Sequence, residues 1–211
     1  MLLLAGCAQG GAAGQKTSAK AHLIELLDLQ QNSTWMVNRT YYLTNSQVVY
    51  FKNSSNIRAD VGFQTAYVLN GTTYYCMEAG GAYSCHMAQA DDQTLRALVR
   101  NSIFFLNRDD VEAMDEADVS ALPNLQVAGV QASCFNVPKG DLAGVINDTQ
   151  LMKTYLARLN GSITEYCFAP DGAPLLKQFI YNQTTWVWSQ ATQYSNQVRD
   201  EDLSLPGPVE N

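Results

Sequence analysis

Apolar and polar residues follow two different periods along this chain. Between residues 17 and 29, leucines and one isoleucine recur at helical spacing behind a threonine and a serine that can cap a helix, which predicts a helix over 17–29. From residue 35 the period shortens to two, and segments rich in Tyr, Val, Thr and Phe are separated by Asn, Ser and Gly. Five strands are predicted in this region, over 35–43, 47–52, 57–61, 64–69 and 72–78.

The rest of the chain mixes both periods. Helical spacing returns in three segments, one of which is strongly acidic, and strand-like runs occupy three more. The predicted helices are 91–105, 109–119 and 148–159, and the predicted strands are 126–137, 162–168 and 175–189, the last of them after a Pro-Asp-Gly turn. The close spacing of the first five strands favours an antiparallel meander, because parallel neighbours need long crossover connections.

Cys7 is the first residue that indicates where the protein works. It ends the sequence Leu-Ala-Gly-Cys, which resembles the lipobox of secreted lipoproteins. The resemblance implies cleavage before Cys7 and a lipid on this residue, so the expected location is extracytoplasmic, with a lipid anchor in the cell membrane. An ordinary apolar N-terminus with a chance cysteine is the alternative.

The length of 211 residues suits one domain of about 175 residues with tails. Residues 1–6 are interpreted as the remnant of a lipoprotein signal peptide, and 7–16 as the lipid anchor and a flexible tether of small residues. The single domain is expected over 17–198. The acidic tail 199–211, which contains two prolines, is expected to be disordered.

The four remaining cysteines form an even set, which permits two disulfides in an oxidising compartment. The glycine pair at 80–81 fits a two-residue hairpin loop, since both residues can adopt positive φ. Counting outward from this loop places Cys76 opposite Cys85 at a non-hydrogen-bonded pair, whose short separation suits a disulfide. The other two cysteines are left to pair with each other. The predicted disulfides are therefore Cys76–Cys85 and Cys134–Cys167, and a zinc site is the alternative, although the chain has no Cys-x-x-Cys pair.

Asn-x-Ser/Thr acceptor sequences occur seven times, whereas about two are expected by chance. This excess indicates a glycosylated surface protein. Together with the lipobox and a net charge of −7, it favours an archaeal cell-surface lipoprotein over a bacterial one. A strand surface rich in Asn and Thr that carries no sugar is the alternative. The candidate glycosylation sites are Asn32, Asn38, Asn53, Asn70, Asn147, Asn160 and Asn182.

Charge and motifs argue against several classes of function. The 13 Lys and Arg residues are scattered among 20 Asp and Glu residues, whereas a nucleic-acid partner requires clustered positive charge. The sequence has no Gly-x-Ser-x-Gly motif, no phosphate-binding loop and only two histidines, so we expect no enzyme, no cofactor and no metal. We interpret His86 as an ordinary strand residue, and the acidic residues of 109–118 as a solvated helix face.

Two stretches resemble archaeal relatives of the LolA / LppX-LprG group of lipoprotein-handling and lipid-carrying proteins. The first covers parts of 50–76, where a basic and an acidic residue on one strand precede a hairpin, and the second is the cysteine-containing hairpin at 164–176. The resemblance implies an α+β fold in which a strongly bent antiparallel sheet, an incomplete barrel, has helices across its concave face. The helical lids would be 17–29 and 91–105.

The same resemblance implies a non-catalytic function, the binding or carrying of a lipid, a lipoprotein or another apolar chain. Leu98 and Phe104 are the candidate residues for contact with that chain. The alternative is a glycosylated cell-surface structural or interaction protein with a closed core, since core packing explains the same apolar residues. The two hypotheses differ in cavity volume, because a ligand site needs several hundred cubic ångströms and a packed core leaves almost none.

Overall fold

The structure, a computed structural model, describes residues 17–42, 44–88, 104–137, 163–181 and 183–210. Most of these residues belong to strands. The strands are β1 Trp35–Tyr41, β2 Ser46–Lys52, β3 Ile57–Val61, β4 Gln64–Leu69, β5 Thr72–Ala79, β6 Ala82–Met87, β7 Ser120–Val127, β8 Val130–Val137, β9 Ile163–Phe168, β10 Pro174–Tyr181, β11 Thr184–Ser195 and β12 Val209–Glu210. The helical elements are the α-helices α1 Ala19–Asn32 and α3 Arg108–Glu112 and the 3-10 helices η1 Glu116–Asp118 and η3 Asp200–Leu203.

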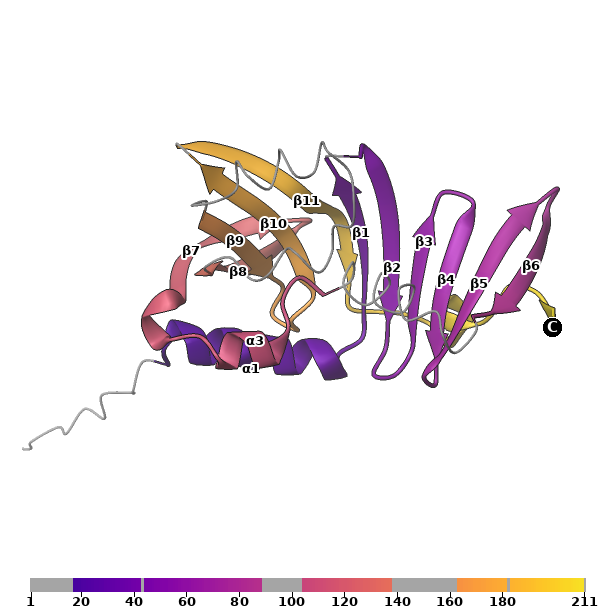
Figure 1. The fold of residues 1–211 in the computed structure, drawn as a ribbon, viewed down its shortest axis with the longest axis horizontal. Helices are drawn as coiled ribbons and strands as arrows, with labels where there is room; N and C mark the ends of the chain where they lie inside the picture. Colours follow the sequence, from indigo (N-terminus) through magenta and orange to yellow (C-terminus); the bar gives the residue numbers. More distant parts are fainter. Residues whose placement is uncertain (1–16, 43, 89–103, 138–162, 182, 211) are drawn as a thin grey trace, which may run out of the picture.

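All twelve strands form one sheet, in the order β12-β6-β5-β4-β3-β2-β1-β11-β10-β9-β8-β7 (Figure 1). Neighbouring strands are antiparallel, except that β12 pairs with β6 in parallel. The sheet is not closed, since β12 and β7 form its two ends. The sheet-rich antiparallel fold expected from the sequence is therefore present.

The meander from β1 to β6 matches the prediction closely, and its last hairpin has the predicted register. Gly80 and Gly81 take φ values of 64° and 83°, and Cys76 pairs with Cys85. Both predicted disulfides are present, with Cα–Cα distances of 4.0 Å for the hairpin pair and 4.1 Å for the pair that joins β8 and β9. These are the predicted pairs Cys76–Cys85 and Cys134–Cys167.

Two hairpins occur where the sequence predicts single strands, so the strands 126–137 and 175–189 are wrong as predicted. The first hairpin, β7–β8, turns at Ala128 and Gly129, both with positive φ. The second, β10–β11, turns near Gln183, which also has positive φ. The first turn contains one glycine, and apolar residues flank it on both sides, so it interrupts the strand-like pattern only weakly. The second turn contains neither glycine nor proline and therefore lacks the strongest turn signals.

The N-terminal helix forms as predicted and packs against one end of the sheet. The Ser18 side chain accepts a hydrogen bond from the Ala21 backbone N–H at 3.1 Å, which caps α1. Buried leucines of α1 form a cluster with Phe135 of β8, Phe168 of β9 and Val111 of α3. The predicted acidic helix 109–119 is shorter and divides into α3 and η1. The predicted helices 91–105 and 148–159 lie outside the described residues, except for the last two residues of the first.

The segment 199–210, which the sequence predicts to be disordered, is instead ordered. It contains η3 and β12, and Leu203 is only 5% exposed. The Arg58 side chain on β3 donates a hydrogen bond to the Asp202 carbonyl at 3.0 Å. The acidic and proline-containing composition of 199–210 is typical of disorder. Burial of Leu203 and packing of Leu205 are nevertheless enough to attach this segment to the sheet.

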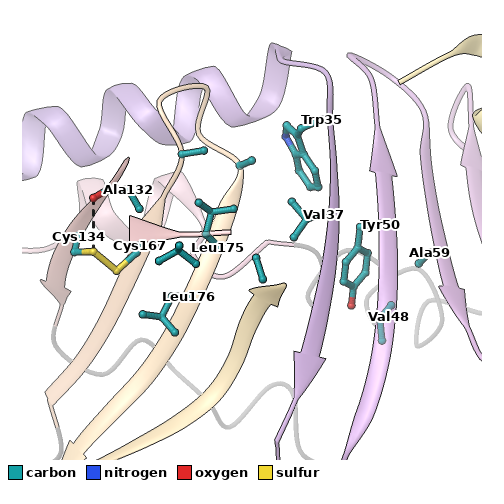
Figure 2. Close-up of a cluster of buried hydrophobic side chains, with 14 residues drawn as sticks. Trp35, Val37, Val48, Tyr50, Ala59, Ala132, Cys134, Cys167, Leu175 and Leu176 are labelled. Atoms are coloured by element: carbon teal, nitrogen blue, oxygen red, sulfur yellow. Dashed lines mark hydrogen bonds between the residues drawn. A yellow bond between two sulfur atoms is a disulfide. The ribbon is translucent and has the colours of Figure 1, made fainter. Parts of the chain in front are cut away.

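A large buried cluster follows the middle of the sheet, from the disulfide between β8 and β9 to Ala59 on β3. Figure 2 shows Trp35 and Val37 of β1 in this cluster, with Leu175 of β10 on one side and Tyr50 of β2 on the other. Among the described residues, no helix has the length and apolar composition that a membrane crossing requires.

Candidate functional site

The strand register divides charge unequally between the two faces of the sheet. Antiparallel partners point to the same face, so Arg39 shares its face with Lys52 on β2 and with Lys177 on β10. We call this surface the Arg39 face. On the antiparallel strands that the structure describes, every carboxylate points to the opposite face, at Asp60, Glu78 and Glu165. Glu210 on the parallel strand β12 pairs with His86 on the Arg39 face, at the far end of the sheet. In a chain of net charge −7, the described antiparallel strands thus place Arg39, Lys52 and Lys177, and none of their carboxylates, on the Arg39 face.

Arg39 lies at the centre of this face and is fully buried. Its Nη2 donates to the Pro174 carbonyl at 2.8 Å, and its Nη1 donates to the Tyr41 hydroxyl at 3.4 Å. Its Cζ lies 4.9 Å from the ring centroid of Tyr50 and 4.4 Å from that of Phe105. Arg39 therefore links β1 to the start of β10 and contacts two aromatic rings, an arrangement that suits a planar guanidinium.

Lys177 lies near Arg39, between apolar residues of β10. Its Nζ is 5.5 Å from the ring centroid of Tyr166, 5.7 Å from that of Phe179 and 5.9 Å from that of Trp188. Burial lowers the pKa of Lys177 to about 8, and the positive charge of Arg39 lowers it further. Among the described residues, Lys177 has ring contacts but no carboxylate or hydrogen-bond acceptor.

Ser189 on β11 places a hydroxyl group beside this lysine. It is the cross-strand partner of Lys177 on β10 and of Tyr41 on β1, and it is fully buried. Within the described part of the chain, its Oγ has no hydrogen-bond partner. A buried hydroxyl without a partner destabilises a fold by about 1–3 kcal/mol, so such groups are uncommon unless they serve a ligand or a water.

Lys52, the third cation of the Arg39 face, has a structural role. Its Nζ donates to the carbonyls of Gln31 at 2.8 Å, Ser33 at 3.2 Å and Asn53 at 3.1 Å. The first two carbonyls belong to the C-terminal end of α1, where a cation is favourable. Burial lowers the pKa of Lys52 to about 8, while the charge of Asp171 opposes this shift.

The Arg39 face is covered unevenly. Over β8 and β9 it is covered by α1 and α3, whose apolar side chains form the cluster with Phe135 and Phe168. Over β3 to β5 the apolar side chains are less protected, since Val61 and Met77 are each 46% exposed and Val68 is half-buried. These residues form an apolar surface next to the buried cations.

The opposite face has a different character. Arg58 and Asp60 on β3 form an ion pair at 2.8 Å, so the two charges that the sequence places on one face pair with each other. The C-terminal segment lies over this region, where Leu205 packs against a buried cluster that contains Tyr67. Near Arg58 and Tyr67 this face is therefore covered by the chain itself.

The predicted contact residues are only partly described. Phe104 is half-buried and packs against the cluster shown in Figure 2. Leu98 and the predicted lipid-anchor residue Cys7 lie outside the described residues. His86 is exposed on β6 and lies 3.0 Å from the Ser84 hydroxyl. In the described ranges, no three His, Cys, Asp or Glu side chains are grouped to hold a metal ion.

The candidate glycosylation sites differ in accessibility. Asn32 at the end of α1 and Asn70 in the β4–β5 turn are exposed. Asn38 and Asn53 are half-buried, and the Asn53 Oδ1 accepts a hydrogen bond from the Asn56 backbone N–H at 2.9 Å. The remaining candidates lie outside the described side chains, at Asn147, Asn160 and Asn182.

Arg39, Lys177 and Ser189 were not predicted as site residues, although the alternation of apolar and polar residues gives a signal for two of them. Arg39 has the same parity as Trp35 and Val37 on β1, so it belongs to the buried face of that strand. Lys177 shares its parity with Phe179. Alternation along the strand could not identify Ser189, because bulges in β11 change its register.

Comparison with known proteins gives weak similarities. No protein-family model and no curated protein matches the chain. Among solved structures, the crystal structure of MucB is 16% identical with a TM-score of 0.48, covering 88% of this chain and 63% of that chain. The MucA/MucB complex of Pseudomonas aeruginosa is matched at 15% identity and a TM-score of 0.43, covering 87% of this chain and 61% of that chain.

A third solved structure is the hypothetical protein CT021 from Chlamydia trachomatis. It is 6% identical with a TM-score of 0.36, and the match covers 92% of this chain and 98% of that chain. The chain spans less than two thirds of the MucB chains that it matches. At these values neither the function nor any residue role is transferred from these structures.

Proposed function

We propose that this protein is a non-catalytic, extracytoplasmic binding protein that holds an apolar chain, such as the tail of a lipid or lipoprotein, against the Arg39 face of its sheet. The observation that carries the proposal is the partly covered apolar surface over β3 to β5, with Val61 and Met77 each 46% exposed. Exposed apolar surface on a sheet that is elsewhere covered marks a place where another apolar group binds. The two disulfides support the extracytoplasmic location.

In this proposal the Arg39 face is the concave face, and α1 is the described part of the lid. Membership of the LolA / LppX-LprG group belongs to the same proposal. Burial of an alkyl chain contributes about 0.8 kcal/mol of favourable free energy per methylene. Association costs about 4–15 kcal/mol in lost translational and rotational freedom. A chain of ten or more carbons is therefore expected to bind, and a short chain is not.

The direct test is binding of a fluorescent, uncharged monoacylglycerol to the full chain. We expect saturable binding to the wild type and at least tenfold weaker binding to Val61→Asp, because a carboxylate on this surface opposes an apolar chain. Val209→Asp is the matched control, since Val209 is 40% exposed on β12 at the end of the sheet, and it should bind as the wild type does. Equal loss in both variants, or no saturable binding to the wild type, would refute the proposal.

Attachment to the membrane through lipid on Cys7 is a separate part of the proposal and rests on the lipobox. Cys7→Ser, made with the natural N-terminal sequence in place, should move the protein from the membrane fraction to the soluble fraction. A variant that still pellets with membranes after a carbonate wash would show another anchor.

The second candidate function is a glycosylated interaction protein, which the exposed positions of Asn32 and Asn70 favour. Intact-mass measurement of the native protein before and after removal of N-linked sugars tests it. A mass loss at these two positions together with no lipid binding would favour the second candidate.

A further inference from the structure

The cations of the Arg39 face are joined through aromatic rings. Arg39 contacts the ring of Phe105 at 4.4 Å, the rings of Phe105 and Tyr166 lie 6.1 Å apart, and Lys177 Nζ lies 5.5 Å from the ring of Tyr166. Two positive charges thus lie along one run of aromatic rings on the same face.

The three cations differ in what they contact. Lys52 already donates to three carbonyls, and Arg39 donates to the Pro174 carbonyl. Lys177 contacts the rings of Tyr166, Phe179 and Trp188 and, among the described residues, no acceptor. Within the described residues, the three N–H donors of Lys177 thus have no partner that competes with a ligand.

Ser189 supplies an independent observation at the same place. Its buried Oγ lies on the residue directly opposite Lys177 and has no hydrogen-bond partner in the described part of the chain. A hydroxyl group and an ammonium group carried by cross-strand neighbours can both donate to the oxygens of one phosphate or carboxylate.

We propose that Lys177 and Ser189 bind the acidic headgroup, phosphate or carboxylate, of the amphiphile whose chain lies on the Arg39 face. This inference rests on the proposed function and names the chemical class of its ligand. Charge supports it, since the described antiparallel strands direct Asp60, Glu78 and Glu165 to the opposite face, and Glu210, the described strand carboxylate on the Arg39 face, lies at the far end of the sheet beside His86. Arg39 adds positive potential beside the headgroup.

The experiment compares probes that share one saturated tail and differ in the headgroup. Tetradecyl phosphate and tetradecanoate are the acidic probes, monomyristoylglycerol is the uncharged probe, and inorganic phosphate is the headgroup alone. Each is titrated calorimetrically, below its micelle-forming concentration, into the full wild-type chain and into Lys177→Met, Lys177→Arg and Ser189→Ala. Arg199→Gln is the control for loss of one positive charge, since the Arg199 side chain is 74% exposed.

We expect the acidic probes to bind the wild type about tenfold to hundredfold more tightly than the uncharged probe, the usual effect of a hydrogen bond to a charged group. Lys177→Met should abolish this preference, Lys177→Arg should keep most of it, and Arg199→Gln should leave it unchanged. Ser189→Ala should reduce it severalfold without lowering thermal stability, because the wild-type hydroxyl has no hydrogen-bond partner among the described residues.

Each other outcome decides against a stated claim. Equal binding of acidic and uncharged probes, unaffected by Lys177→Met, would overturn the headgroup assignment and leave the proposed function intact. If inorganic phosphate bound as tightly as tetradecyl phosphate, and Lys177→Met abolished both, the tail would contribute nothing. That result would overturn the claim that the ligand is an amphiphile. Absence of binding by every probe would overturn both the headgroup assignment and the proposed function.

Discussion

Gly172→Ala is the substitution that tests most sharply how α1 is held against the sheet. Gly172 lies in the turn between β9 and β10, with φ of +82°, and a Cβ atom there would overlap the Leu26 carbonyl and lie 2.5 Å from the Gln30 backbone nitrogen. Left-handed φ destabilises alanine by about 1–2 kcal/mol. Overpacking against the helix backbone adds about 1–3 kcal/mol, so the expected loss in the free energy of unfolding is about 2–5 kcal/mol.

The matched control is Gly129→Ala, in the β7–β8 turn. Gly129 has a similar φ of +84°, but nothing lies within 4 Å of its added Cβ atom. The control should therefore lose only the backbone part, about 1–2 kcal/mol. Urea denaturation of both variants, monitored by tryptophan fluorescence, measures the difference between their free energies of unfolding. Equal destabilisation of the two variants would show that α1 does not lie against this turn.

Three further predictions follow from the buried charges and the C-terminal segment. Lys52→Met should lower the free energy of unfolding by about 2 kcal/mol, measured in urea, because helix carbonyls lose their donor. Burial lowers the pKa of Lys177 to about 8, so between about pH 8 and 10.5 the folded chain releases this proton before the unfolded chain does. The stability of the wild type relative to Lys177→Met should therefore rise with pH across this window, and burial raises the pKa of the neighbouring Tyr166. A constant difference across that window would contradict the burial of Lys177. Leu203→Asp should release the segment that precedes β12, seen as faster amide exchange in β6, whereas unchanged exchange would show that η3 does not hold it.

The sequence predicts the meander well because its turns carry strong local signals. Gly80 and Gly81 determine the register of the β5–β6 hairpin, and this register determines the first disulfide. The β10–β11 hairpin was missed because its turn at Gln183 contains neither glycine nor proline, so it lacks the strongest turn signals.

The candidate site was much harder to predict than the fold. Lys177 and Ser189 are far from Arg39 in the sequence, and only the pairing of β1 with β11 and of β11 with β10 brings them onto one face. Bulges in both pairings shift the register by a residue, which no local pattern records. The unequal distribution of charge therefore emerges only from the assembled sheet.

The central claim is that an apolar chain lies on the Arg39 face, and intermolecular nuclear Overhauser effects test it most directly. The protein would carry labelled valine methyl groups, and the bound monoacylglycerol would supply the methylene protons. Val61 and Val68 lie on the Arg39 face, whereas Val49 lies on the opposite face of β2. We predict Overhauser effects from the chain to Val61 and Val68 and none to Val49. Effects to Val49 without effects to the other two valines would contradict the account.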